Sequence, residues 1–149
     1  MANESRETAL RVAVEKEEQS RGFYASWAAR VGDPGAAALL RELAAEEVRH
    51  KERLLEGLPL AQATGVPAGA APDLSDFLVE HELSAVATTQ DVLIAAIKRE
   101  ERARVMYLQL GKWVPAGALR DLLNSLADDE AGHKTRLEMI YDTLVLTDD

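Results

Sequence analysis

Cysteine is absent from this sequence of 149 residues. Its absence excludes disulfide bonds, zinc–thiolate sites, iron–sulfur clusters and cysteine nucleophiles together. The sequence also lacks any long apolar run that could span a membrane, and the polar residues 1–10 do not resemble a signal peptide. We therefore expect no membrane span and a cytoplasmic location.

Aromatic residues and clustered basic residues are scarce as well. Aromatic residues make up 5% of the chain and hydrophobic residues 47%, with alanine and leucine dominant, which favours helices over strands. The net charge is −9, and lysine and arginine are scattered along the chain. This distribution argues against a nucleic acid or an acidic membrane as a partner. The length suits one domain, residues 1–149.

The sequence repeats itself at an offset of 83 residues, and no gap is needed between Ala13 and Leu54. The repeated pairs include Glu17 and Glu100, Tyr24 and Tyr107, Glu47 and Glu130, and His50 and His133. Two copies of one helical hairpin explain this pattern best.

Breaks in the hydrophobic pattern predict four helices. We expect them at about 5–31, 34–56, 88–112 and 115–144. Asp33 is the predicted N-cap of the second helix with Pro34 at its first position, and Pro115 is predicted to open the fourth. The second helix should stop at Gly57-Leu58-Pro59. The hairpins then cover about 5–57 and 89–145.

The linker between the hairpins, residues 58–88, is long. Residues 57–72 are rich in alanine, glycine and proline and are predicted to form a loop, whereas residues 76–87 are candidates for a short helix. A linker of this length can cross from one end of a bundle to the other. The fold class predicted is therefore all-α, a four-helix bundle with one long crossover between helices 2 and 3.

Each helix is predicted to turn one row of residues toward the bundle interior. The residues in these rows are small or apolar, apart from one serine, two tyrosines and six ionisable residues. The six are Glu17, Glu47, His50, Glu100, Glu130 and His133. Four carboxylates in one dry core would repel one another, and their desolvation would be costly. Two divalent cations would balance their charge, with the two imidazoles as neutral ligands. The alternative is a polar network in a metal-free bundle.

The spacing of these residues suits metal binding. In the motif Glu-x-x-His, both side chains project from one face of a helix, one turn apart. The motif occurs at Glu47–His50 and again at Glu130–His133, and each other helix adds one glutamate. Ferritin-like di-iron and di-manganese bundles use the same ligand set, so iron is the expected metal and manganese the alternative.

With these motifs in view, the chain resembles the rubrerythrin branch of the ferritin-like superfamily. Residues 14–24 look like the first-helix signature of that family, and residues 43–50 look like its second. The resemblance implies that Glu17 and Glu100 are terminal ligands, that Glu47 and Glu130 bridge two irons, and that the two histidines bind one iron each. Tyr24 and Tyr107 match tyrosines that lie beside such sites, either as core residues bonded to carboxylates or with a redox role.

The resemblance also implies a function. We expect a redox enzyme in which a diferrous centre reacts with hydrogen peroxide or oxygen, as a peroxidase or ferroxidase. An iron-storage protein and a dimanganese catalase are the alternatives. Full-length rubrerythrins carry a rubredoxin domain with four cysteines, so electrons here must come from an external donor or from ferrous iron. They also carry an extra glutamate one turn after the third-helix ligand, where this chain has Arg102-Ala103.

Several residues near the motifs are expected to lie outside the ligand set. Glu18 and Glu101 should be solvated, and Glu46 and Asp129 are candidates to orient the histidines. His81 should be a surface residue. Trp27 and Trp113 are expected to contribute to packing or to dimer contacts. A homodimer is the default expectation.

Overall fold

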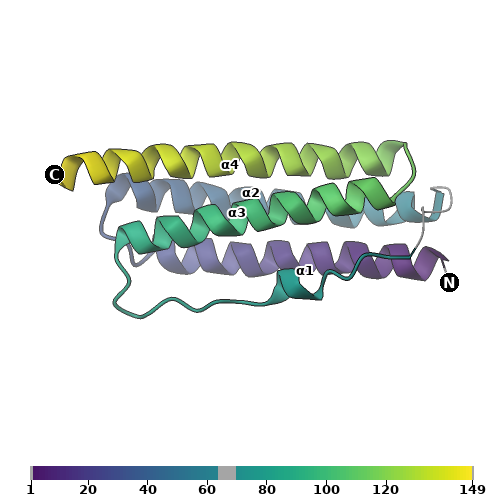
Figure 1. Ribbon diagram of the computed structural model, residues 1–149, viewed down its shortest axis with the longest axis horizontal. Coiled ribbons are helices and arrows are strands. Elements are labelled where there is room, and N and C mark those ends of the chain that lie inside the picture. Colours follow the sequence, from purple (N-terminus) through teal and green to yellow (C-terminus); the bar gives the residue numbers. More distant parts are fainter. Residues whose placement is uncertain (1, 64–69, 149) are drawn as a thin grey trace.

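The protein is an all-helical bundle, seen in a computed structural model that describes residues 2–63 and 70–148 (Figure 1). Its elements are α1 (Ala2–Ala28), α2 (Pro34–Ala63), the 3₁₀ helix η1 (Ser75–Leu78), α3 (Thr89–Trp113) and α4 (Ala118–Asp148). The described residues contain no strand. The predicted four-helix bundle is confirmed. None of the described helices is sufficiently long and apolar to cross a membrane.

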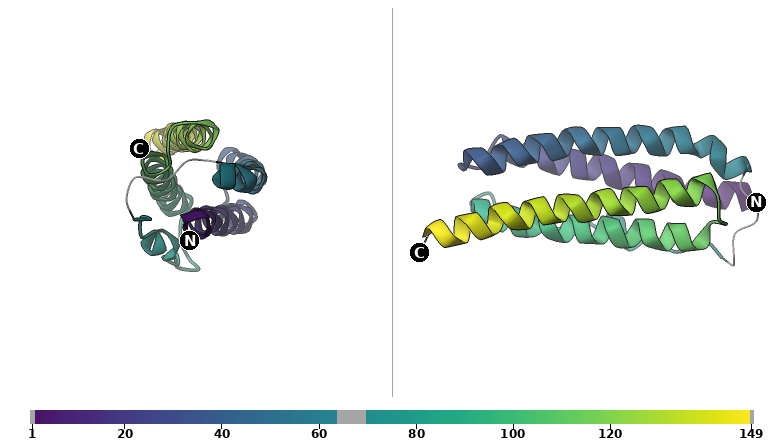
Figure 2. Two further views of the ribbon diagram at one scale, coloured as in Figure 1. Left: turned by 90° about the vertical axis from the view of Figure 1, so that its right-hand side faces the viewer. Right: turned by 90° about the horizontal axis from the view of Figure 1, so that it is seen from above.

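The bundle consists of two helical hairpins, α1–α2 and α3–α4. Helix α2 lies beside α4, and α1 lies beside α3, so the four helices surround one interior (Figure 2). Residues 70–88, the described part of the connection from α2 to α3, run back along the bundle to the end at which α3 begins (Figure 1). η1 lies in this connection and packs on α1 and α3. This is the long crossover that the sequence predicts.

Two helix starts follow the expected capping chemistry. At α2, a carboxylate oxygen of Asp33 accepts a hydrogen bond from the Ala36 N–H at 2.8 Å, with Pro34 at the first helical position. At α3, Thr88 and Asp91 form a capping box, in which each side chain accepts a hydrogen bond from the backbone N–H of the other residue. Local residue chemistry therefore determines both starts.

The prediction that the second helix stops at Gly57-Leu58-Pro59 is wrong, because α2 continues to Ala63. Gly57 lies against α4, where an added Cβ would come within 2.8 Å of Cδ2 of Leu122. Leu58 packs against the adjacent core. This packing keeps the chain helical past a proline that lacks a backbone N–H. Of the predicted loop 57–72, residues 64–69 lie outside the described residues.

Other helix ends also differ from the sequence prediction. Pro115 does not open the fourth helix, which starts at Ala118. The backbone is extended at Val114, the residue before the proline, and Gly117 has a φ of +151°, so the chain is not helical between them. This helix continues beyond residue 144, to Asp148. Helix α1 spans residues 2–28 instead of 5–31, and its end is a turn in which the N–H groups of residues 30 and 31 both donate to the carbonyl of Trp27.

The short helix expected at 76–87 is reduced to η1, and residues 79–88 are not helical. Side chains from the bundle hold the backbone carbonyls of this region. Gln19 donates to the carbonyl of Leu78 at 3.2 Å, and Arg102 donates to that of Val79 at 3.3 Å. These bonds replace the hydrogen bonds that a further helical turn would make.

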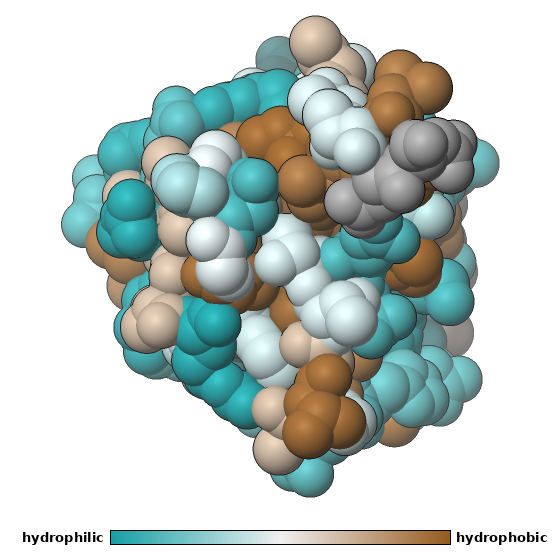
Figure 3. Space-filling view, turned by 90° about the vertical axis from the view of Figure 1, so that its left-hand side faces the viewer, coloured by the Kyte–Doolittle hydropathy of each residue, from teal (hydrophilic) through white to brown (hydrophobic). Residues whose placement is uncertain are grey.

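The apolar core is divided into two clusters along the bundle. One cluster contains Leu10, Leu54, Leu110 and Leu123, and the other contains Leu40, Leu43, Leu93 and Leu137. Every one of these leucines is at most 2% exposed. At the bundle end where α4 finishes, exposed hydrophobic residues are interspersed with hydrophilic ones (Figure 3).

The capping box at the start of α3 yields a test of the fold. Replacing Thr88 by alanine should lower the free energy of unfolding by about 1 kcal/mol, because the N–H of Asp91 loses its partner. Thr88→Ser keeps the hydroxyl and should stay close to the native protein. Urea unfolding followed by circular dichroism measures both variants. Equal stability of the alanine and serine variants would contradict the capping role.

Candidate metal centre

Six ionisable side chains meet in the interior of the bundle, and none is more than 5% exposed. They are Glu17 from α1, Glu47 and His50 from α2, Glu100 from α3, and Glu130 and His133 from α4. The structure thus brings together all six residues that the sequence singles out. Each helix contributes at least one of them, so the arrangement depends on the complete bundle.

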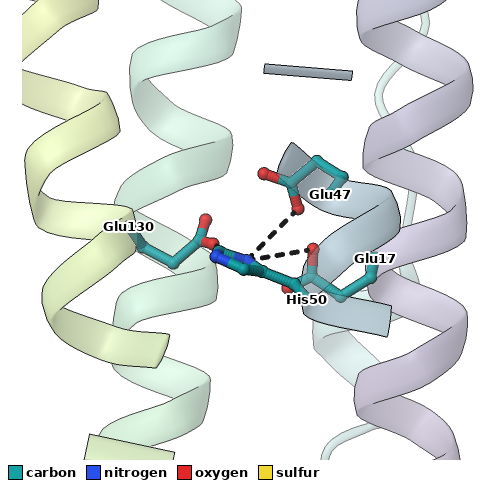
Figure 4. Close-up of side chains that lie close together, drawn as sticks. All are labelled: Glu17, Glu47, His50 and Glu130. Atoms are coloured by element: carbon teal, nitrogen blue, oxygen red, sulfur yellow. Dashed lines mark ion pairs between the residues drawn. The ribbon is translucent and has the colours of Figure 1, made fainter. Parts of the chain in front are cut away.

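The six residues form two overlapping groups, each of which could hold one metal ion. The first group contains Glu17, Glu47, His50 and Glu130, and the second contains Glu47, Glu100, Glu130 and His133. Within each group, one possible ligand atom per residue lies within 4.8 Å of all the others. Figure 4 shows the first group, drawn from α1, α2 and α4. Glu47 and Glu130 belong to both groups, so each could contact both ions.

The inward nitrogens of the two histidines face carboxylate oxygens. Nδ1 of His50 lies 2.7 Å from Oε1 of Glu130 and 3.7 Å from Oε2 of Glu17. Nδ1 of His133 lies 3.5 Å from Oε2 of Glu100 and 3.6 Å from Oε1 of Glu47. The two imidazole rings are nearly parallel, with centroids 5.5 Å apart. The donor atoms of both groups therefore converge on the same small volume.

Each of the six residues has one buried side-chain atom without a hydrogen-bond partner among the described residues. These atoms are Glu17 Oε2, Glu47 Oε1, His50 Nδ1, Glu100 Oε2, Glu130 Oε1 and His133 Nδ1. Buried polar atoms without partners are rare and costly. Oxygen and imidazole nitrogen atoms in this arrangement are suitable ligands for a first-row divalent metal. The residues present therefore fit a pair of metal ions.

Outer carboxylates hold the far nitrogen of each histidine. Nε2 of His50 lies 3.2 Å from Oδ2 of Asp129, and Nε2 of His133 contacts Oε2 of Glu46. An ionised carboxylate can only accept, so each Nε2 carries a hydrogen, and Nδ1 is the nitrogen of each ring that could bind a metal ion once the ring is neutral. Arg53 stabilises the carboxylate of Asp129 through a contact of 2.9 Å. Glu46 and Asp129 therefore occupy the orienting positions for which the sequence makes them candidates.

The two tyrosines of the repeat contact carboxylates of the cluster that come from the opposite hairpin. Tyr24 on α1 donates its hydroxyl to Glu100, and Tyr107 on α3 donates to Glu17. Both tyrosines are fully buried. Burial and the neighbouring carboxylates raise the pKa of both phenols well above the ordinary value, so both stay protonated. These bonds orient the two carboxylates, while a redox role for the tyrosines stays a prediction.

Burial and the neighbouring charges shift the pKa values of residues within the cluster. Burial, together with the charges of Glu100 and Glu17, raises the pKa of Glu130 well above its ordinary value. Burial lowers the pKa of His133, but hydrogen bonding and attraction to Glu100 and Glu46 outweigh it and raise the pKa overall. Without cations, Glu130 and His133 therefore retain protons at pH values at which isolated side chains of the same type would release them.

The remaining candidate residues lie outside the cluster. Glu18 pairs with Arg21, and Glu101 pairs with Arg104, at 2.6 Å in each case. His81 is exposed and lines a surface groove instead. Trp27 is 8% exposed and Trp113 is 7% exposed, and both pack in the core clusters.

Sequence reasoning missed the basic residues that precede the glutamates of α1 and α3. Lys16 and Arg99 are 83 positions apart, so they occupy equivalent positions of the repeat. Lys16 is 1% exposed. Burial, and then repulsion from Arg99, lower its pKa to about 8. Comparing the sequence with itself at the 83-residue offset, which matches Glu17 with Glu100, also matches Lys16 with Arg99 and could have identified both basic residues.

The comparison with known protein families agrees with this geometry. The family model of rubrerythrin matches residues 2–58 and 91–149, which include both hairpins and leave out the crossover. The chain belongs to the rubrerythrin family. No curated protein and no solved structure matches it. Membership of the rubrerythrin family supports metal binding at the buried carboxylate and histidine cluster.

The outer carboxylates of this rubrerythrin-family protein can be tested directly. Asp129→Asn should weaken metal binding about 10-fold to 100-fold, because the ring of His50 loses its charged acceptor. Asp128→Asn is the matched control, since Asp128 is exposed and precedes Asp129 in the chain. Competition with a metal-binding dye measures the affinity. Equal losses of metal affinity in the two variants would show that Asp129 acts only through its negative charge and not through its contact with His50.

The raised pKa of Glu130 predicts how the stability of the metal-free protein depends on pH. The folded chain keeps a proton on Glu130 that the unfolded chain releases above its ordinary glutamate pKa. Stability should therefore fall as the pH rises above the ordinary pKa of a glutamate, until the folded chain releases the proton as well. Glu130→Gln should flatten this decline, whereas replacing the exposed Glu15 by glutamine should leave it unchanged. Thermal unfolding in the presence of chelator measures the effect, and an unaltered slope for Glu130→Gln would contradict it.

Proposed function

We propose that the protein is a non-haem di-iron redox enzyme whose six clustered residues hold two iron ions. The observation that supports this proposal best is the cluster of four buried carboxylates, each with an oxygen that lacks a partner among the described residues. Two divalent cations carry four positive charges and would balance them. Glu47 and Glu130 would bridge the ions, since both belong to both groups.

The remaining four residues would bind one ion each, Glu17 and His50 on one side and Glu100 and His133 on the other. Two ferrous ions would supply the two electrons that, with two protons from the solvent, reduce one hydrogen peroxide to two waters; the same two electrons could begin the reduction of oxygen. The chain itself excludes water, because the ligands lie between two apolar clusters. Tyr24 and Tyr107 hold the terminal carboxylates in place.

Two features of the chain bear on its electron source and oxidant. The sequence contains no cysteine, so the electrons would come from outside these 149 residues or from ferrous iron itself. Ala103, one turn after Glu100, is buried and offers no additional carboxylate. The symmetric set of six ligands therefore supports iron oxidation as well as peroxide reduction.

The proposal is tested by mixing anaerobic, ferrous-loaded protein with hydrogen peroxide or with oxygen and following the oxidation of iron by stopped-flow absorbance. The native protein should oxidise iron at least about 100-fold faster than the Glu47→Ala/Glu130→Ala variant. The control is Glu15→Ala/Glu138→Ala, in which two exposed carboxylates are removed. Faster oxidation by hydrogen peroxide would indicate a peroxidase, and faster oxidation by oxygen would indicate a ferroxidase.

Other outcomes would contradict the enzyme proposal. Iron oxidation no faster than in the double variant would exclude redox catalysis at this cluster. Retention of far more than about two irons per chain after oxidation would indicate a storage protein. Peroxide breakdown only in manganese-loaded protein would indicate a dimanganese catalase.

A further inference from the structure

A surface groove of about 880 Å³ lies between α3 and crossover residues 79–87, outside the metal centre. None of the six clustered residues lines it. Apolar side chains line much of it, among them Phe23, Leu83, Val86 and Ile94. Val86 is 85% exposed and Ile94 is 37% exposed, so apolar surface of both side chains is open to solvent. The volume suits a small organic molecule.

Positive charge collects at one end of this groove, where Lys98, Arg99 and Arg102 line it. Arg99 is neutralised by Glu80, at 2.5 Å. Arg102 donates only to backbone carbonyls among the described residues, so its charge has no anionic partner there. Lys98 is exposed and makes no ion pair within the described part of the chain. Lys98 and Arg102 are therefore the two basic lining residues that form no ion pair with the described residues.

Most of the acidic residues that line the groove are already engaged. Glu101 pairs with Arg104 at 2.6 Å and with Lys134 at 3.3 Å. Asp91 forms the capping box at the start of α3, away from the basic end. Glu82 is the one acidic lining residue that pairs with no basic side chain and caps no helix within the described residues. Glu82 therefore offsets one of the two unpaired basic charges, and the groove keeps an excess of one positive charge.

We propose that this groove binds an amphiphilic organic acid with a single carboxylate and an aliphatic chain. The carboxylate would lie at Lys98 and Arg102, and the chain would run along α3 toward Ile94 and Val86. Charge complementarity supports the acid group, and the exposed apolar side chains support the chain. The lining residues Asp91 to Arg102 span about 16 Å of helix, enough for a medium-chain acid. This site does not depend on the metal centre.

Decanoate is the probe for this proposal, titrated into full-length protein labelled with ¹⁵N and followed by amide chemical shifts. Saturable shifts should be confined to residues that line the groove. Butyrate, which lacks most of the chain, and 1-decanol, which lacks the charge, should each bind at least about tenfold more weakly.

Two pairs of variants locate the site. Lys98→Gln should weaken decanoate binding at least about tenfold, whereas Lys112→Gln, on the same helix outside the groove, should change it less than about twofold. Ile94→Glu should abolish binding by placing a negative charge in the groove. Val48→Glu is its matched control, because Val48 on α2 is also 37% exposed.

Three results would overturn the proposal. The first is the absence of saturable binding of decanoate. The second is equal binding of 1-decanol, which would show that the positive charge plays no part. The third is a change in oligomeric state on Ile94→Glu but not on Val48→Glu, measured by sedimentation, which would make the groove a contact surface between two copies of the chain.

Discussion

The structure depends on four glutamates that face one another in a dry interior. Two unit charges about 4 Å apart repel by about 4 kcal/mol at an effective dielectric constant near 20, and desolvation adds to this penalty. Protons on the cluster, or cations within it, must offset this repulsion. Oxygen and nitrogen atoms from all six side chains converge in two overlapping groups, each of which could hold one cation.

The contacts around the cluster follow the internal repeat. The phenol of Tyr24 reaches Glu100 across the bundle, and Asp129 reaches back to His50. Their repeat equivalents make the matching contacts in the opposite direction. Each hairpin therefore orients ligands that the other hairpin provides. Because each group also draws ligands from both hairpins, neither hairpin can complete a metal group alone, and metal binding should be coupled to assembly of the bundle.

The sequence predicted most of this arrangement, because the relevant signals are local or repeated. Helical spacing alone places Glu47 and His50 on one face, and the 83-residue offset doubles that motif. The end of α2 could not be predicted in the same way, because packing of Gly57 on α4 overrides the local signal of Pro59. Nor could the lack of a helix at residues 79–88, since side chains distant in sequence, such as Arg102, bind the backbone carbonyls there.

The central claim is that the six clustered residues hold a pair of metal ions, and an anaerobic titration with ferrous iron tests it most directly. The account predicts uptake that saturates at about two irons per chain. That uptake should be lost in Glu47→Ala/Glu130→Ala and kept when two exposed glutamates are replaced. Failure of the folded native protein to take up iron or manganese would contradict the account and leave a helical bundle with a protonated polar core.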